Sequence, residues 1–276
     1  MGKNKIQDEF KDSKVLYEFL EECIVDKVNK NLSKKKDKFL EAYKLFLGKD
    51  ASSTVDNCVH WLNDKGLDNT WIGITGSWRT INKEVVDDIN KIVRYAISEG
   101  MGILTGGALG VDYIATDLVL FAGNPFKELR IVLPINRLTY IERIANSYDK
   151  IDGIDKTQVD LLTNQLEYIN SKYPEIIFDD SHFNEKDFLK PENENYRTDS
   201  YYFRNGLIAY GCNGLVALCI NNSKGVIDTI NKAKFMKKPI FIKNYEIDEN
   251  SKEVIKDYSQ IDIPNLDDSR LRGVLY

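Results

Sequence analysis

Residues 71–80, WIGITGSWRT, decide the fold of this chain, and residues 102–113, GILTGGALGVDY, repeat the same pattern further along. Each stretch is a short apolar run that stops at small residues and then opens into a helical pattern. This succession of strand, loop and helix is typical of a βαβ unit. We therefore predict a buried parallel strand at 71–75 and a second one at 102–105.

The segments after these two strands carry signals for helix starts. Asn82 suits a helix cap, and the second helix is expected to begin near Leu109, with Asp112 in its opening turn. The apolar residues that follow Asn82 recur at the spacing of one helix face. They are Val85, Val86, Ile89, Ile92, Val93, Ala96 and Ile97.

Glycine-bearing turns link each strand to its helix, at Thr75-Gly76-Ser77 and at Gly106-Gly107. Backbone N–H groups and helix N-termini converge at the carboxyl ends of neighbouring parallel strands, so the two turns indicate an anion site with phosphate as the expected ligand. The same glycines would also serve tight turns in any α/β protein. Neither segment is G-x-G-x-x-G or G-x-x-x-x-G-K-[ST], so a purely structural interpretation stays open.

Three further apolar runs continue the predicted sheet, at 129–133, 214–220 and 239–242, and every connection is long enough for a parallel crossover. Residues 137–203 interrupt the alternation and carry eight Lys or Arg against fourteen Asp or Glu, an acidic excess that would repel nucleic acid. The turn at 221–225 holds small residues, a lysine and a helix start. It is the third turn compatible with a phosphate.

These patterns divide the chain into three parts. Residues 1–68 have helical periodicity and form a predicted α-helical N-terminal region. Residues 69–246 are predicted to form an α/β domain with a Rossmann-like, doubly wound, mainly parallel sheet, in which about 137–203 is a helical and loop insertion. Residues 247–276 are polar and are expected to wrap the surface as a C-terminal tail.

Composition excludes several classes of protein. The 276 residues are 42% hydrophobic and 29% charged, as in a globular protein, and the net charge of −5 disfavours a surface that binds polyanions throughout. With no apolar leader or membrane-length run, we expect a cytoplasmic protein without a membrane partner. The four cysteines form no C-x-x-C pair, and Cys58 with His60 lacks further ligands, so we predict no metal and no cofactor.

Four segments in sequence order resemble the SLOG superfamily, which includes the DNA-processing protein DprA (Smf) and the Lonely Guy phosphoribohydrolases. ITGSWR at 74–79 is similar to the family's G-S-R turn, and TGGALGVD at 105–112 to its S-G-G-A-x-G-I-D. FRNGLIA at 203–209 is similar to R-N-x-x-I-A, and GVIDTINKA at 225–233 to G-x-x-x-T-x-x-x-A. The resemblance implies a Rossmann-like crevice that binds a nucleotide-like small molecule, and a homodimer.

Carried over residue by residue, the resemblance places twelve residues around that crevice. Glycines there would let backbone donors approach phosphate oxygens, and the cationic side chains would add charge-assisted contacts. Asp112 would suit either a ribose hydroxyl pair or the end of a nearby arginine. The twelve are Gly76, Ser77, Arg79, Gly106, Gly107, Asp112, Arg204, Asn205, Ser223, Lys224, Gly225 and Thr229.

The sequence departs from both named branches of the family. The Lonely Guy enzymes carry P-G-G-x-G-T-x-x-E, but here Thr229 stands at the glutamate position and Asp228 one residue earlier, which turns the carboxylate by about 100 degrees on a helix. DprA lacks a residue such as Trp78 inside the G-S-R turn, prefers serine at the place of Lys224, and has no comparable acidic insertion.

Three hypotheses about function follow. The first is binding or sensing of a small phosphorylated nucleotide derivative, with a bulky residue at Gly107 expected to block the pocket. The second is a nucleotide N-glycosidase, for which Asp112, Asp228 and Glu84 are the candidate carboxylates. The third is single-stranded DNA binding or recombination mediation of the DprA kind, in which the aromatic triplet 201–203 would stack bases.

Overall fold

The structure is a computed structural model, and it describes residues 70–79, 81–146, 148, 154–179, 196–248 and 250–262, the side chains of 196–199 and 260–262 excepted. It also describes Phe19, Leu20, Cys23, Asn57, Cys58 and Trp61. Most of the predicted N-terminal region, the acidic loop after residue 179 and the end of the predicted tail lie outside the described residues.

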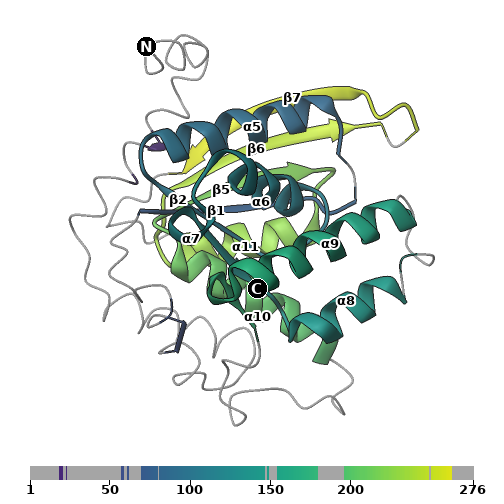
Figure 1. Cartoon of the computed structure of the whole chain (residues 1–276). Helices are drawn as coiled ribbons and strands as arrows, with labels where there is room; N and C mark the ends of the chain where they lie inside the picture. Colours follow the sequence, from purple (N-terminus) through teal and green to yellow (C-terminus); the bar gives the residue numbers. More distant parts are fainter. Residues whose placement is uncertain are drawn as a thin grey trace.

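One seven-stranded sheet forms the centre of the molecule, in the order β4-β3-β2-β1-β5-β6-β7 (Figure 1). All neighbouring strands are parallel except β6 and β7, which are antiparallel. The predicted doubly wound, mainly parallel α/β sheet is confirmed. The strands are β1 (Trp71–Gly76), β2 (Gly102–Thr105), β3 (Leu129–Val132), β4 (Ile177–Phe178), β5 (Gly214–Ile220), β6 (Ile240–Ile247) and β7 (Val254–Asp262).

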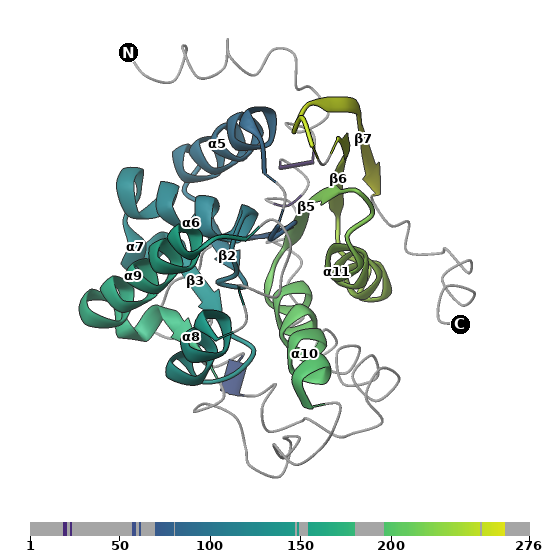
Figure 2. The same ribbon diagram turned by 90° about the vertical axis from the view of Figure 1, so that its right-hand side faces the viewer.

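Helices cover both faces of this sheet. Figure 2 shows α5, α6 and α9 on one side and α10 and α11 on the other, with α8 beyond the tip of β3. None of the described helices is long and apolar enough to cross a membrane. The helices are α5 (Lys83–Ser98), α6 (Val111–Ala122), α7 (Pro125–Glu128), α8 (Arg137–Ala145), α9 (Lys156–Lys172), the short 3₁₀ helix η4 (Pro174–Ile176), α10 (Tyr196–Gly211) and α11 (Lys224–Phe235).

Strand β5 shows why the sheet needs helices on both faces. A strand buried on both sides reads as a continuous apolar run, because alternate side chains enter different layers. Val216, Leu218 and Ile220 lie in the layer under α5 and α6. Leu215, Ala217 and Cys219 lie in the layer under α10 and α11.

Helix α5 begins as predicted. The Asn82 side chain accepts a hydrogen bond from the backbone N–H of Val85 at 3.1 Å, which satisfies one of the donors that a helix start leaves open. Most of the predicted apolar face is buried, namely Val85, Ile89, Ile92, Val93 and Ala96.

Residues from the predicted N-terminal region pack into the core of the α/β domain. Phe19, Leu20 and Cys23 are fully buried in the layer under α5 and α6, and the Phe19 ring lies 6.1 Å from that of Phe241 between centroids. Cys58 is buried in the other layer. These described residues therefore belong to the same core as the sheet.

Two strands differ from the expected order of elements. β4 lies inside the predicted insertion and pairs with β3, and β7 lies inside the predicted tail and pairs with β6. β4 is only two residues long, and 255–259 of β7 are exposed, so neither has an apolar period to detect. The aromatic triplet 201–203 lies within α10, which begins at Tyr196 inside the predicted insertion.

The strand order reverses next to β1. After β1 the chain adds β2, β3 and β4 on one side, and then returns to add β5 and β6 on the other. The helices that follow β1 and β5 therefore leave the sheet on opposite faces, which opens a crevice at the carboxyl ends of these two strands.

Candidate functional site

A cavity of about 450 Å³ occupies this crevice. Its walls come from the turn after β1, the turn after β2, α8, α10 and the start of α11. The lining residues are Thr75, Gly76, Trp78, Arg79, Ala108, Leu109, Asp112, Tyr140, Arg143, Ile144, Tyr148, Ile154, Tyr201, Tyr202, Arg204, Asn205, Ile208, Ser223, Gly225 and Val226.

A buried ion pair between Asp112 and Arg204 lies in the cavity wall. Arg204 Nη1 is 3.7 Å from Asp112 Oδ2, and both side chains are more than nine-tenths buried. The same Nη1 donates a hydrogen bond to the carbonyl oxygen of Gly106. Arg204 Nε is buried without a hydrogen-bond partner among the described residues.

Asp112 also closes the turn that precedes it. Its Oδ2 accepts hydrogen bonds from the backbone N–H groups of Gly106 at 3.0 Å and Ala108 at 3.4 Å. Burial raises the pKa of Asp112 to about 6, against the opposing effects of the Arg204 charge and the two N–H groups. Desolvation of the carboxylate is therefore the largest influence on its protonation.

The two glycines of this turn do not line the cavity, contrary to the expectation for Gly106 and Gly107. A Cβ at Gly106 would overlap the Arg204 guanidinium. Gly107 has a φ of 60° and faces the opposite way, where a Cβ would meet the side chains of Ile131 and Leu133. A bulky residue at Gly107 would therefore strain the backbone and crowd β3, so the expected clean block of the pocket is wrong.

In the turn after β1, Gly76 and Arg79 line the cavity but Ser77 does not. Ser77 is buried, and its carbonyl oxygen accepts a hydrogen bond from the first N–H of α6, that of Val111, at 3.1 Å. Arg79 is exposed, and its guanidinium carbon lies 4.6 Å from the centroid of the Trp78 ring. This pair forms a flat cationic and aromatic surface at the rim.

The turn after β5 brings the start of α11 to the cavity. Ser223 and Gly225 line it, whereas Lys224 is exposed and does not. The Ser223 side chain makes no capping hydrogen bond, so the N–H groups of the first turn of α11 have no side-chain cap. An uncapped helix start beside a cavity favours an anion.

Asn205, Asp228 and Lys232 form a second polar cluster behind that turn. Asn205 Nδ2 donates to the Gly225 carbonyl at 3.3 Å and to Asp228 Oδ2 at 2.9 Å. Lys232 Nζ donates to the same carboxylate oxygen at 2.6 Å and to the Tyr202 carbonyl at 2.7 Å. Burial lowers the pKa of Lys232, and Asp228 opposes the shift. The cluster fixes Asn205 and the backbone at Gly225.

The remaining predicted positions lie outside the cavity wall. Thr229 is fully buried and its hydroxyl donates to the Gly225 carbonyl at 3.0 Å, so it bonds within α11 and does not face a ligand. Asp228 is engaged by Lys232, and Glu84 is exposed on α5. Of the three carboxylates considered for hydrolysis, only Asp112 lines the cavity.

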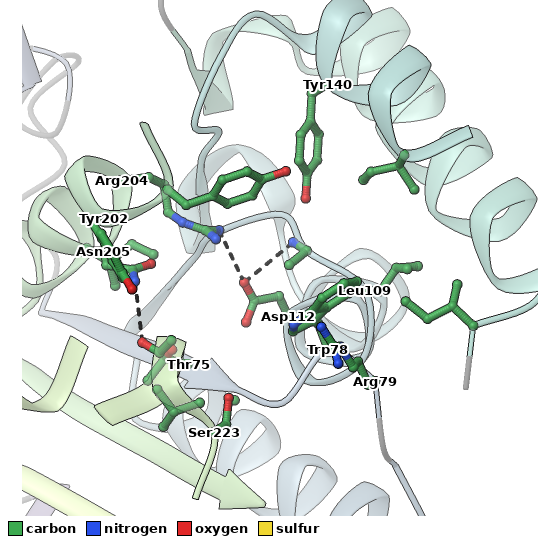
Figure 3. A pocket seen from close by; sticks show the side chains of 18 of the residues that line it. Thr75, Trp78, Arg79, Leu109, Asp112, Tyr140, Tyr202, Arg204, Asn205 and Ser223 are labelled. Carbon is green, nitrogen blue, oxygen red and sulfur yellow. Dashed lines mark hydrogen bonds and ion pairs between the residues drawn. The ribbon is translucent and has the colours of Figure 1, made fainter. Parts of the chain in front are cut away.

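Sequence reasoning missed the wall that α8 provides. Tyr140, Arg143 and Ile144 of α8 line the cavity, together with Tyr148 beyond its end. Burial raises the pKa of Tyr140, whose ring lies 6.4 Å from that of Tyr201 between centroids. Figure 3 shows Tyr140 and Ser223 on opposite sides of the Asp112–Arg204 pair. The spacing of 140, 143 and 144 on one helix face was the available signal.

The cavity wall is cationic and aromatic. Its charged lining residues are Arg79, Asp112, Arg143 and Arg204, which together carry a net positive charge of two. In the part of the chain that the structure describes, no group of three or more His, Cys, Asp or Glu side chains suits a metal ion. This arrangement can therefore bind an anionic ligand that has an aromatic or flat portion.

Of the comparisons with known proteins, the one with solved structures found chains similar to this one. No protein-family model and no curated protein matches this sequence. The chain is similar to DNA processing protein A from Helicobacter pylori, which binds single-stranded DNA, with a TM-score of 0.43 and 20% identity over 65% of this chain and 67% of that one. It is also similar to DprA from Streptococcus pneumoniae, with a TM-score of 0.41 and 15% identity over 64% of this chain and 50% of that one.

Proposed function

We propose that this chain binds a small phosphorylated nucleotide derivative in the cavity beside β1 and β5. The observation that carries the proposal is the cavity wall, whose volume of about 450 Å³ suits a small-molecule site. Guanidinium groups bind phosphate oxygens, and aromatic rings offer faces for a base. The arginines are Arg79, Arg143 and Arg204, and the aromatic residues are Trp78, Tyr140, Tyr148, Tyr201 and Tyr202.

The start of α11 is the expected place for a phosphate. Ser223 and Gly225 line the cavity there, and the first turn of the helix has no side-chain cap. Phosphate oxygens accept hydrogen bonds from such N–H groups, and the helix dipole favours the negative charge. Asn205 supports this arrangement because it holds the Gly225 carbonyl from behind.

Asp112 is the expected partner of a ligand hydroxyl. Its contacts to Gly106, Ala108 and Arg204 all fall on Oδ2. This leaves Oδ1, in a residue that lines the cavity, to accept a hydrogen bond from a ribose hydroxyl. Both interpretations of Asp112 considered from the sequence therefore fit one carboxylate, with one oxygen for the arginine and one for the ligand.

A ligand panel tests the proposal directly. Nucleoside mono- and diphosphates, ADP-ribose and cyclic nucleotides are added to the full chain, and the melting temperature is measured. A ligand at about 100 times its Kd adds about 2.7 kcal/mol of stability, which for a chain of this size raises the melting temperature by several degrees. If no compound in the panel shifts the melting temperature, the proposal is wrong.

Arg79→Ala locates the site within the molecule. Arg79 is exposed and contacts the Trp78 ring, so its removal should leave stability nearly unchanged. Loss of a charge-assisted contact should weaken the ligand found in the panel by about 1.5–3 kcal/mol, measured by calorimetry. Arg94→Ala is the matched control, because Arg94 is an exposed arginine on α5 that does not line the cavity. Equal affinities for both variants would contradict the site.

Single-stranded DNA is the second candidate, and the Trp78–Arg79 pair favours it. A base could stack on this exposed surface at the rim while its phosphates meet the arginines. Several phosphate contacts would make log K fall steeply with log salt, with Arg79 sharing in the slope. Titration of oligo-dT at several salt concentrations separates the two candidates, since no complex at low salt removes this one.

A further inference from the structure

The contacts of Asp112 within the protein all fall on one of its two carboxylate oxygens. Oδ2 accepts from the backbone N–H groups of Gly106 at 3.0 Å and Ala108 at 3.4 Å, and it lies 3.7 Å from Arg204 Nη1. Oδ1 makes no hydrogen bond with a described residue, and it is not one of the sealed polar atoms that lack a partner there. Because Asp112 lines the cavity, Oδ1 is open to it. Closing the turn therefore uses half of this carboxylate and leaves the other half for a ligand.

Tyr140 of α8 brings a second polar atom to the same part of the cavity. Its ring is buried, and within the described ranges its hydroxyl is neither hydrogen-bonded nor sealed from the cavity. Figure 3 shows this hydroxyl directed toward the Asp112–Arg204 pair. Burial is the main cause of the raised pKa of Tyr140, and the Asp112 charge adds to the shift. The phenol therefore stays protonated at neutral pH, and it can both donate and accept.

The parts of the cavity follow the order of the parts of a nucleotide. The start of α11 beside Ser223 lies on one side of the Asp112–Arg204 pair, and Tyr140 lies on the other (Figure 3). The Tyr140 ring is 6.4 Å from that of Tyr201 between centroids, so this second side is aromatic. In a nucleotide the sugar stands between the phosphate and the base. A phosphate at the start of α11 therefore places the sugar beside Asp112.

We propose that Asp112, assisted by Tyr140, selects the sugar, and that the ligand is a ribonucleotide whose 2′ and 3′ hydroxyls are free. This inference rests on the proposed nucleotide-binding function and names its ligand class. Asp112 Oδ1 accepts a charge-assisted hydrogen bond from one hydroxyl, and the Tyr140 hydroxyl bonds to the other. A site built to bind a hydroxyl rejects an analogue that lacks it, because the polar groups of the site then lose their partner.

The same selection separates the two candidate ligands. Within a DNA strand the sugar has no 2′ hydroxyl, and its 3′ oxygen is esterified to the next phosphate. An internal deoxynucleotide therefore offers no hydroxyl to Asp112, and a carboxylate left without a partner beside the phosphates of the strand disfavours binding. The open oxygen of Asp112 favours a small ribonucleotide over single-stranded DNA.

Calorimetry on the full chain at about pH 7.5 tests the inference. Burial raises the pKa of Asp112 to about 6, so the carboxylate is ionised under this condition. The 5′-monophosphates of the four common ribonucleosides are measured first, and the tightest base is then used as its 2′,3′-dideoxy 5′-monophosphate. The ribonucleotide should bind at least about tenfold more tightly, as loss of a charge-assisted hydrogen bond predicts. The 2′-deoxy and 3′-deoxy compounds then identify the hydroxyl that Asp112 binds.

Asp112→Asn changes the oxygen that faces the cavity. The groups around Oδ2 are all donors, so the amide oxygen of the variant takes that place and the amide N–H groups turn to the cavity. A neutral hydrogen bond then replaces a charge-assisted one, and the preference for ribose should fall at least about threefold. Glu84→Gln is the matched control, because Glu84 is an exposed carboxylate on α5 outside the cavity wall. It should keep the wild-type preference.

Tyr140→Phe is the second variant, and it keeps the proposal testable if Asp112→Asn does not fold. It removes only the hydroxyl, which bonds to no described residue, so the buried ring and the fold should be retained. Loss of the second hydrogen bond should lower the preference for ribose at least about twofold.

Two results overturn the inference while the proposed function survives. One is equal affinity of the wild type for the ribonucleotide and its dideoxy analogue, which would show that the sugar hydroxyls are not bound. The other is an unchanged preference in Asp112→Asn, or in Tyr140→Phe where the first variant does not fold, which would show that other groups read the sugar. If no nucleotide binds at all, the proposed function and the inference are both wrong.

Discussion

Helices α6 and α11 both begin at the carboxyl end of a strand beside the cavity, yet their first turns are satisfied differently. At α6, the Val111 N–H donates to the Ser77 carbonyl, and Asp112 accepts from Gly106 and Ala108 in the preceding turn. At α11, the Ser223 side chain makes no cap. Neither helix has a side-chain cap at its start, so the difference is that the first N–H of α6 is bonded to the Ser77 carbonyl, whereas the start of α11 lines the cavity through Ser223 and Gly225.

The difference shows that glycines at a strand end do not by themselves make a phosphate site. Gly106 and Gly107 give the turn after β2 the more phosphate-like sequence, but its buried carboxylate takes the donors and would repel an anion. The turn before α11 looks weaker in sequence, yet Gly225 lines the cavity and a Cβ there would meet no atom within 4 Å.

Asp112→Ala should have the largest effect on stability. It removes the acceptor of two backbone N–H groups and leaves the buried Arg204 charge without its partner. Breaking a buried ion pair on one side costs about 3–5 kcal/mol of unfolding free energy, measured by chemical denaturation. Glu84→Ala, an exposed carboxylate on α5, is the control and should stay within about 0.5 kcal/mol. A loss below about 1 kcal/mol for Asp112→Ala would contradict a closed turn.

The pH dependence of stability should report the same carboxylate. Burial raises the pKa of Asp112 from 3.8 to about 6 in the folded chain, so between these values the folded state holds a proton that the unfolded state has lost. Stability from this group is therefore fully present below about pH 4 and is lost as pH rises to about 6, by on the order of 2–3 kcal/mol.

Asp112→Asn isolates this contribution from that of other carboxylates. Asn cannot ionise and keeps a similar shape, so the difference between wild-type and variant unfolding free energies should change between pH 4 and 6 and then level off. Denaturant titrations at five or six pH values would measure it. Parallel curves for the two proteins across this window would mean that Asp112 titrates normally.

Much of the fold could be read from the sequence, because buried parallel strands carry an unbroken apolar signal. The predicted runs at 71–75, 102–105, 129–133, 214–220 and 239–242 correspond to β1, β2, β3, β5 and β6. The two missed strands carry no such signal, since β4 is too short and most of β7 is exposed.

The cavity was harder to predict than the fold. Arg79, Asp112 and Arg204 lie in segments that stand out in the sequence, and all three line the cavity. Arg143 and Tyr140 lie on an amphipathic helix whose place over the strand ends is set by tertiary contacts, such as that of Arg137 with Glu167. A helical period tells which residues share a face, but not what the face meets.

Gly106→Ala and Gly225→Ala form a matched pair with the smallest expected effects on stability, and the two should act in opposite directions. A Cβ at Gly106 would overlap the Arg204 guanidinium and lie 2.8 Å from Asp112 Oδ2, so the buried pair must shift. Overpacking of this kind costs about 1–3 kcal/mol of unfolding free energy. Because the pair that must shift lines the cavity, affinity measured on the remaining folded protein should fall together with stability.

Gly225→Ala should leave the fold intact or stabilise it slightly, because Gly225 is a helical residue with open space around it and Ala is favoured over Gly in helices by up to about 1 kcal/mol. The added methyl group would stand at the cavity wall, where a phosphate must approach the first N–H groups of α11, so affinity for the nucleotide found in the panel should fall. Higher stability with weaker binding is the signature of a glycine kept for its ligand. If Gly225 serves only the turn, its replacement by Ala should lower the stability or change neither the stability nor the nucleotide affinity. Unchanged nucleotide affinity in Gly225→Ala would therefore show that the start of α11 is not part of the binding site.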